Sequence, residues 1–575
     1  MTALPFGLPL GLPPGLPCEL LHATADVLVV GAGGAACRAA LSAAQAGARV
    51  TLLAKAPLGV GGSSVHGASE VMGISAAAGF GDDDAPGTHY ADTMRLAEGF
   101  VDPALVQALA EDAGPRVHDL AALGVPFDRA GNRYALLKSD HNTRGRTLTA
   151  QGRTGTEIVR ALTAAMLAAG VQVHAPAMLL DLLRDAEGQV CGALAWDLAR
   201  HCVVVHRARA VVLATGGIHG AFSSQVSTAE MTGDGQAIAF RHGAELVNLE
   251  FHQFGPAMLH PYVQLFSGTL FRLHPRITNT AGEDALAKHL PAGVSAEEVH
   301  AEKVFPFTTS NASRWLEVAM QREVQAGLGT PRGGLWFSFA HQSAATLRAR
   351  TPNTHRWLAE RGLDMGRDAL EVGIAFQCMN GGVRMLDGTA RASLPGLYVC
   401  GEVAGGVRGP DRPGGNSLAE GQVFGHRAGL AAAAAPAKGE PVTLAESLDR
   451  LAQGFAAPPE PALDGMAQAL REAMQRHCLV EKTATGLAET LALAEALDAA
   501  VEAAPGMSPE TLPATLSRAN LALCARLVLQ ACLHRDETRG AHNRVDCPGR
   551  DDARHRHSYV LRRQGQAARI SPLAY

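Results

Sequence analysis

The segment ADVLVVGAGGAACRAALSAAQAGARVTLLAK, residues 25–55, decides the fold. Its apolar run 26–30 predicts a buried strand, the alanine-rich run 35–46 predicts a helix, and the run 49–53 predicts a second strand. Strand, helix and strand in this order form a βαβ unit, in which the two strands lie parallel in one sheet. We therefore expect an α/β fold built on a parallel sheet.

A glycine-rich turn joins the first of these strands to the helix. Gly31, Gly33 and Ala36 occupy the positions of a G-x-G-x-x-[G/A] pattern, which permits a tight turn, close approach to a pyrophosphate and helix–strand packing. The N–H groups of the helix N-terminus would then face the phosphates. An ordinary βα turn without a ligand is the alternative interpretation. Ala54 and Lys55 stand where a plain NAD site would have an acidic residue, which argues against NAD.

Two later segments repeat the combination of an apolar strand and a glycine-rich turn. ARAVVLATGG, residues 208–217, is a strand of the kind that closes the cofactor domain of FAD enzymes. LPGLYVCGEVAGGVRGPDRPGGNSLAEGQVFGHRAG, residues 394–429, is a strand followed by a loop that enters a helix. In this segment Glu402 is suited to bind ribitol or ribose hydroxyls, and residues 416–418 would open the helix towards an isoalloxazine ring.

Length, charge and cysteine spacing limit the class of protein. The 575 residues are enough for two to four domains, and a formal net charge of −5 with no long charged run gives no sign of nucleic acid as a partner. Ten cysteines without a CxxC pair indicate neither an iron–sulfur cluster nor a metal site, and they fit a reducing compartment. The proline-rich N-terminus is interpreted as a loose tail, and no membrane span is expected. We expect a cytoplasmic protein.

With the segments 232–246 (TGDGQAIAFRHGAEL) and 537–552 (ETRGAHNRVDCPGRDD), these elements resemble the flavoprotein family of succinate dehydrogenase, fumarate reductase and L-aspartate oxidase. The resemblance runs from about Asp26 to about Asp552. It implies FAD and a set of residues around it. The implied cofactor-binding residues are Gly31, Gly33, Gly34, Ala36, Ala54, Lys55, Gly62, Ser63, Ser64, Gly67, Ala214, Thr215, Gly216, Asp234, Glu402, Asn416, Ser417 and Leu418.

The resemblance also bears on how FAD is attached. Dehydrogenases of this family join FAD covalently to a histidine in the loop after the second strand, and Ser63 occupies that place here. His66 lies three residues further on, and the alternative to a link there is a polar residue that only lines the flavin pocket. We therefore expect noncovalent FAD.

The predicted architecture is a Rossmann-like FAD-binding domain with an inserted α/β capping domain and a C-terminal helical domain. Because the cofactor segments are far apart in the sequence, the FAD-binding domain must be discontinuous. The expected boundaries are an N-terminal tail 1–25, FAD-binding domain 26–250 and 373–435, capping domain 251–372, and C-terminal helical domain and tail 436–575.

The substrate-binding residues implied by the family are mostly replaced. Its dicarboxylate enzymes hold substrate with two histidines, a Thr-Glu pair and arginines, because carboxylates need fixed cationic donors. The corresponding positions carry Gly255, Gln377, Ser267 with Gly268, and, for the cap arginine, Ser313. Arg412 matches the family arginine. The candidate catalytic residues are therefore Arg412, His252 as a compensating acid or base, and Arg314, one position from the cap arginine.

The sequence thus predicts an FAD-dependent oxidoreductase, a dehydrogenase, reductase or oxidase. It would transfer a hydride between flavin N5 and a small carboxylate-bearing substrate, and it would not be a standard succinate or fumarate enzyme. The alternative is a flavoprotein subunit that passes electrons to a separate, iron–sulfur partner protein. No cluster motif occurs in this chain, so that function requires another polypeptide.

Overall fold

The computed structural model describes residues 16–81, 83–456, 463–503 and 506–575. Its central element is a parallel five-stranded sheet in the order β21-β13-β2-β3-β9. The strands are β2 (Val27–Val30), β3 (Val50–Leu53), β9 (Gln172–His174), β13 (Ala210–Leu213) and β21 (Leu397–Val399). The first three segments predicted from the sequence thus form the expected βαβ unit, and strand β13 joins it to β21 from a distant part of the chain.

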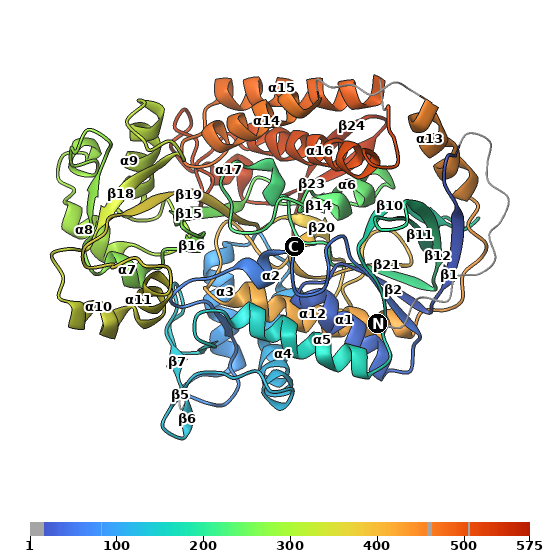
Figure 1. Ribbon diagram of the computed structural model, residues 1–575, viewed down its shortest axis with the longest axis horizontal. Helices are drawn as coiled ribbons and strands as arrows, with labels where there is room; N and C mark the ends of the chain where they lie inside the picture. The colour runs from blue at the N-terminus through green and yellow to red at the C-terminus, as the bar shows by residue number, and fades with distance from the viewer. Residues whose placement is uncertain (1–15, 82, 457–462, 504–505) are drawn as a thin grey trace.

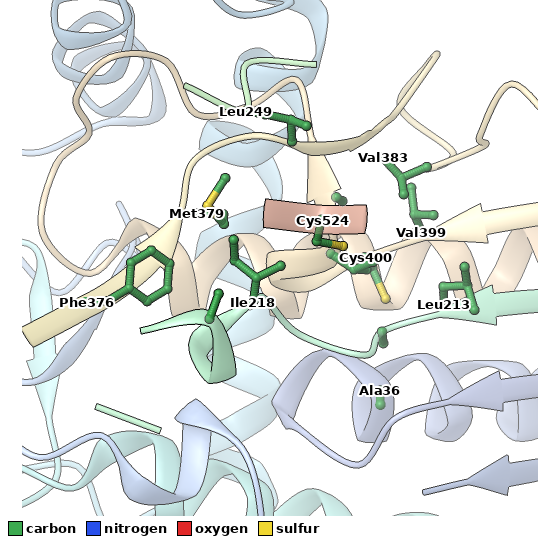
Figure 2. Packing of buried hydrophobic residues seen from close by; sticks show 14 of the residues in the cluster. Ala36, Leu213, Ile218, Leu249, Phe376, Met379, Val383, Val399, Cys400 and Cys524 are labelled. Carbon is green, nitrogen blue, oxygen red and sulfur yellow. The ribbon is translucent and has the colours of Figure 1, made fainter. Parts of the chain in front are cut away.

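Helix α1 (Gly34–Gln45) follows β2 and packs against α12 (Asn416–Ala433). Small residues allow the close approach, since a Cβ at Gly425 would lie 2.6 Å from the carbonyl oxygen of Ala35. Figure 2 shows the result in the core, where Ala36, Leu213, Val399 and Cys400 come together from elements far apart in the sequence. The predicted discontinuous segments therefore share one hydrophobic core.

A second sheet, in the order β1-β12-β11-β10, lies beside the first in Figure 1. It consists of β1 (Leu20–Thr24), β10 (Ala177–Arg184), β11 (Val190–Asp197) and β12 (Cys202–Arg207). Residues 20–24 were expected to belong to a tail, and the structure differs there. Strand β1 pairs in parallel with β12, and Leu20, Leu21 and Ala23 are buried, so the pairing and its apolar contacts order this segment. Residues 1–15 of the expected tail lie outside the described residues.

The capping domain is built on the sheet β16-β15-β19-β18-β17. Its strands are β15 (His252–His260), β16 (Gln264–Leu265), β17 (Arg276–Thr278), β18 (Gly334–Ser338) and β19 (Leu370–Met379), and its helices are α7 (Gly268–Phe271), α8 (Ala296–Glu302), α9 (Arg314–Gln325), α10 (Ala344–Arg350) and α11 (Pro352–Ala359). Figure 1 shows this domain at one end of the molecule. Because β19 pairs with β15 and β18, we place the end of the cap sheet after Met379 rather than at residue 372.

The C-terminal region contains α13 (Leu444–Ala456), α14 (Leu463–His477), α15 (Ala484–Ala503) and α16 (Leu512–His534). Helices α14, α15 and α16 pack together along one side of the molecule (Figure 1). Among the described helices, α16 alone is long and apolar enough to cross a membrane, and 61% of its most apolar window is buried inside the protein. That burial is typical of a core helix.

The last part of the predicted C-terminal domain and tail forms a hairpin of β23 (Ser558–Gln564) and β24 (Ala567–Leu573). Strand β23 pairs with β14 (Leu246–Val247), which extends the sheet β22-β20-β14-β23-β24. The hairpin therefore fastens the end of the chain to the FAD-binding domain.

The remaining elements are α2 (Ser63–His66), β4 (Gly73–Ser75), α3 (Pro86–Ala97), α4 (Pro103–Ala122), β5 (Arg129–Ala130), β6 (Arg133–Tyr134), β7 (Leu136–Leu137), β8 (Thr147–Thr149), α5 (Thr154–Ala168), the 3-10 turns η1 (His219–Ala221), η2 (Ala287–His289) and η3 (Gly401–Val403), α6 (Asp234–Arg241), β20 (Gly382–Arg384), β22 (Ala404–Gly405) and α17 (Asp552–His555).

The arginine-rich loop after α16 folds back onto the FAD-binding domain. Arg535 is fully buried, bonds Glu250 (2.8 Å) and Glu537 (2.9 Å), and lies against aromatic rings that include Phe100. Further along the loop, the carbonyl oxygen of Gly540 accepts the N–H of Thr309 in the capping domain (3.0 Å). The loop thus connects the C-terminal region to both other domains.

Candidate active site

A cavity of about 320 Å³ lies between the glycine-rich turn after β2, the end of β13, the loop before α12 and the edge of the capping domain. Its size is in the range of small-molecule sites. Most of the residues predicted from the sequence line it. These are Gly31, Gly33, Gly34, Ala54, Lys55, Gly62, Ser63, Ser64, Gly67, Ala214, Thr215, Gly216, Asp234, Glu402, Arg412, Ser417 and Leu418.

The two glycines of the turn have different surroundings. Gly31 has a φ of +125°, and a Cβ there would lie 2.2 Å from the carbonyl oxygen of Ala214, so the residue serves strand packing. At Gly33 a Cβ would meet, among described atoms within 4 Å, only the Ser64 Oγ at 3.5 Å. The space over Gly33 therefore belongs to the cavity, as close approach of a pyrophosphate requires. Ala36 does not line the cavity and is fully buried in α1.

Lys55, at the end of β3, organises one wall of the cavity. Its Nζ lies 3.0 Å from Oδ2 of Asp234 and donates to Thr232 Oγ1 (3.2 Å) and to Ser517 Oγ of α16 (2.8 Å). Asp234 also accepts the side-chain amide of Asn520 (2.8 Å). This ion pair brings the predicted cofactor segments together with the C-terminal region.

The loop and helix start at the other wall contribute Glu402, Ser417 and Leu418. Glu402 Oε1 accepts the backbone N–H of Met379 (3.0 Å), which fixes the carboxylate at the cavity surface. Asn416 does not line the cavity, since its side chain bonds His89 (2.8 Å) and Thr93 (3.0 Å) of α3. Its amide therefore anchors the start of α12.

Several polar atoms at the cavity surface are buried without a hydrogen-bond partner in the described part of the chain. They are Thr215 Oγ1, Ser267 Oγ, Gln377 Oε1, Arg412 Nε and Ser417 Oγ. Since unpaired buried polar groups are costly, such a set at one cavity indicates that polar ligand atoms complete it. The open space over Gly33 and these atoms fit FAD together with a polar substrate.

Arg412 is one of the cations that line the cavity. It is buried, and its guanidinium donates to the carbonyl oxygen of Pro413 (3.3 Å) and to Cys378 Sγ (3.6 Å). No carboxylate oxygen of the described residues lies within 4.0 Å of its guanidinium nitrogens, whereas the guanidinium of the neighbouring Arg408 lies 2.7 Å from Glu420. The charge of Arg412 is therefore available to an anionic ligand.

Comparison with known proteins shows the family of the chain. The FAD binding domain family matches residues 26–418, and the fumarate reductase flavoprotein C-terminal family matches residues 467–572. The chain is 35% identical to L-aspartate oxidase of Caulobacter vibrioides, with 91% of this chain and 94% of the relative covered. The chain belongs to the succinate dehydrogenase, fumarate reductase and L-aspartate oxidase flavoprotein family. It is accordingly an FAD-dependent oxidoreductase.

Two further similarities support membership. This flavoprotein is 30% identical to one subunit of the fumarate reductase (CoM/CoB) of Methanothermobacter marburgensis, with 91% and 94% of the two chains covered. Its fold is similar to that of the Mycobacterium smegmatis Sdh1 complex, with a TM-score of 0.81 at 27% identity, covering 96% of this chain and 94% of the other. The predicted three-part architecture, an FAD-binding domain with a capping and a C-terminal helical domain, is confirmed.

The structure does not bring the other two candidate catalytic residues of the flavoprotein to the cavity. His252 is buried beside Phe222 and Phe376, and its Nε2 donates to the carbonyl oxygen of Cys478 (2.6 Å). Arg314 begins α9, where its guanidinium donates to the carbonyl oxygen of Thr309 (3.4 Å). Neither residue lines the cavity. His66 is exposed, and its ring bonds the carbonyl oxygen of Val60 (2.7 Å).

Two acidic residues of the cavity, Asp140 and Glu230, were not predicted from the sequence. Asp140 lines the cavity and accepts the backbone N–H of Phe305 in the capping domain (3.1 Å). Burial raises the pKa of this carboxyl above its ordinary value, although the Phe305 amide and the charges of His141, Arg272 and Lys303 oppose the shift. No local motif marks Asp140, because the segments that surround it come from the capping domain and the loop before α12.

Proposed function

We propose that this flavoprotein transfers a hydride between flavin N5 and a carbon of a small organic acid, with Arg412 as the group that binds the substrate carboxylate. The observation that carries the proposal is the buried guanidinium of Arg412, which faces the cavity with an unpaired Nε and no carboxylate partner in the described residues. A carboxylate at this position would gain a charge-assisted contact in a site of low dielectric constant.

FAD would be held noncovalently in the larger part of the cavity. The turn at Gly33 and Ser64 would contact the pyrophosphate, Glu402 would bind sugar hydroxyls, and the segment at Ser417 and Leu418 would lie by the isoalloxazine ring. When bound, FAD supplies the acceptor or donor of the hydride. The residues of the chain position the substrate beside it and exclude water.

Two observations favour a substrate other than succinate or fumarate. At Gly255, where dicarboxylate enzymes of the family have a histidine, the ring of Phe305 fills the space, with its Cε2 2.5 Å from a Cβ built there. Gln377 stands at the position of the second histidine and has a free Oε1 at the cavity. A relative is named L-aspartate oxidase and another fumarate reductase, which supports an acid but leaves its identity open to experiment.

An anaerobic substrate screen tests the proposal. Purified flavoprotein would be mixed with a panel of organic acids, and bleaching of the oxidised flavin band would be followed for each one. We expect at least one carboxylate to reduce the flavin and its uncharged amide or ester to fail. Equal reduction by the amide would contradict the assignment of Arg412.

A second candidate function is to pass electrons, as one polypeptide of a complex, to a separate partner protein, which could carry an iron–sulfur cluster. It is favoured by the relative whose name makes it one subunit of a fumarate reductase. The chain purified alone distinguishes the two. An independent enzyme turns over with a dye as electron acceptor, whereas a chain that requires its partner is reduced by substrate but does not turn over.

A further inference from the structure

Some of the charged side chains that line the cavity form ion pairs within the protein. Lys55 pairs with Asp234 (3.0 Å), and Arg408 pairs with Glu420 (2.7 Å). Arg412 and Asp140 are a cation and an acid that line the same cavity and have no ion-pair partner among the described residues. The cavity therefore offers a place for one negative group and one hydrogen-bond or proton donor.

Asp140 is held rigidly between two domains. Its carbonyl oxygen accepts the N–H of Gly414 (2.9 Å), two residues after Arg412, and its Oδ2 accepts the N–H of Phe305 from the cap (3.1 Å). The next residue, His141, has a φ of 67°, and its Nε2 lies 3.7 Å from Oδ2 of Asp411. The acid and the arginine are thus carried by two segments that are bonded directly to each other.

We propose that Asp140 is the proton acceptor of the reaction, and that the substrate is a monocarboxylate with an amino or hydroxyl group on the carbon that is oxidised. This rests on the proposed function. The C–H bond of that carbon breaks and its electron pair leaves as hydride to the oxidised flavin. The N–H or O–H bond breaks, its proton goes to the carboxylate of Asp140, and a C=N or C=O bond forms. The substrate thus loses two electrons and two protons: the hydride carries both electrons and one proton to the flavin, and Asp140 takes the second proton.

A second carboxylate on the substrate fits the cavity poorly. It would approach Asp140, and two carboxylates that share a site repel each other. Of the other cations nearby, Lys303 bonds Glu317 (2.5 Å) and Arg408 bonds Glu420. Arg272 is exposed and does not line the cavity. The charge of Arg412 can therefore neutralise one substrate carboxylate. Asp140 favours a substrate that presents an N–H or O–H group to it.

The surroundings of Asp140 suit a base. The charged groups that act on it are His141, next in the chain, and Arg272 and Lys303 from the cap. Asp411, in the loop before α12, lies 3.7 Å from His141. Burial raises the pKa of Asp140, which makes its carboxylate a stronger base than an exposed aspartate. Because the deprotonated form accepts the proton, the rate of flavin reduction must rise as the pH rises through this pKa.

The first experiment compares substrates at pH 8 with the FAD-loaded, full-length protein. One panel contains 2-amino and 2-hydroxy monocarboxylates, and the other contains succinate and other saturated dicarboxylates without such a group. We expect anaerobic flavin bleaching by a member of the first panel. Bleaching by a dicarboxylate of the second panel, and by no member of the first, overturns this inference but leaves the proposed function standing. Bleaching by no acid of either panel overturns both.

The second experiment uses Asp140→Asn, with Asp449→Asn on the exposed face of α13 as the control. With the substrate found above, Asp140→Asn should lower the rate of flavin reduction at least 100-fold while flavin occupancy stays unchanged. The binding of succinate, followed by the shift of the flavin spectrum, should tighten at least fivefold. The control variant should match the wild type in all three measurements.

Asp140→Glu retains a carboxyl group at this position. It serves as a control in case Asp140→Asn loses activity only because it folds poorly. It should retain a measurable rate and the rise of that rate with pH, whereas Asp140→Asn should lose the pH dependence. A wild-type rate and pH profile in Asp140→Asn would overturn the assignment. The assignment would also be overturned if both variants lost the same share of the rate and both kept the pH profile of the wild type.

Discussion

A Cβ atom at Gly31 would lie 2.2 Å from the carbonyl oxygen of Ala214, so the turn after β2 and the end of β13 are in backbone contact. This contact joins two of the segments that form the cofactor cavity. We expect Gly31→Ala to destabilise the fold by about 2–4 kcal/mol, because the methyl group clashes with backbone and a φ of +125° disfavours alanine. Urea denaturation of the cofactor-free protein measures the loss. A stability equal to that of the wild type would show that the two strands can move apart.

Gly33→Val should impair the binding of FAD rather than the stability of the fold. Gly33 has φ −75° and ψ 179°, which valine adopts freely, and the side chain would project into the cavity. We expect loss of FAD binding with little change in the melting temperature of the apoprotein. The ratio of flavin absorbance to protein gives the answer, and full occupancy in the variant would mean that the pyrophosphate lies elsewhere.

Acid precipitation should release FAD into the supernatant. Ser63 stands where related dehydrogenases carry the linking histidine, and the ring of His66 points to the carbonyl oxygen of Val60 rather than to the cavity. Denaturing electrophoresis followed by fluorescence imaging should show a non-fluorescent band. Flavin that stays with the polypeptide would contradict noncovalent binding.

Arg412→Met should retain FAD and lower kcat/KM about 100-fold or more, since loss of a buried charge-assisted contact corresponds to about 3 kcal/mol. Lysine should restore activity only in part, because it lacks the planar fork of the guanidinium. Arg408→Met is the matched control. Arg408 bonds Glu420 and the carbonyl oxygen of Met379 (2.6 Å), so that variant should lose thermal stability together with activity.

Unchanged turnover of Arg412→Met with its true substrate would exclude a role in carboxylate binding. Loss of flavin together with activity would indicate instead that Arg412 braces the loop before α12. Flavin occupancy, melting temperature and turnover should therefore be measured on one preparation.

Glu537→Gln should destabilise the protein by about 1.5–3 kcal/mol at pH 7, because it removes the charge of a buried carboxylate that bonds Arg535 and Arg539. Glu250 and Glu98 remain as counter-charges of these two guanidinium groups. Burial raises the pKa of Glu537, but bonds from Arg539 and the Asp551 amide, with the charge of Arg535, outweigh it and lower the pKa below its ordinary value. The stabilisation is complete above the unfolded pKa of about 4.3 and disappears as the pH falls through the folded pKa. Urea denaturation of both proteins at several pH values should show the difference shrinking below about pH 4. A difference that is constant with pH would contradict this account.

Local patterns predicted the nucleotide-binding part of the fold closely. The strand expected at 26–30 is Val27–Val30, and the helix expected at 35–46 is Gly34–Gln45. Glycine motifs specify backbone positions, and backbone positions follow from local sequence. This is why most of the predicted cofactor residues lie at the cavity.

The direction in which each side chain points could be learned only from the tertiary structure. The amide of Asn416 turns to His89 and Thr93 because α3 packs there, and a motif carries no information about that neighbour. His252 lies on the face of β15 that meets aromatic rings and Cys478. Asp140 escaped prediction because the amide that orients it belongs to Phe305, 165 residues later in the chain.

The strand order of the central sheet determines when the cofactor site comes into being during synthesis. Strand β13 lies between β2 and β21, and α12, which ends at Ala433, covers α1. Three quarters of the polypeptide must therefore leave the ribosome before the last wall of the cavity exists. Until then the nascent chain exposes one edge of β13 and one face of α1, surfaces that domain-by-domain folding would normally cover early. FAD is accordingly expected to bind late in synthesis. A chaperone that covers the incomplete central sheet would act before FAD binds.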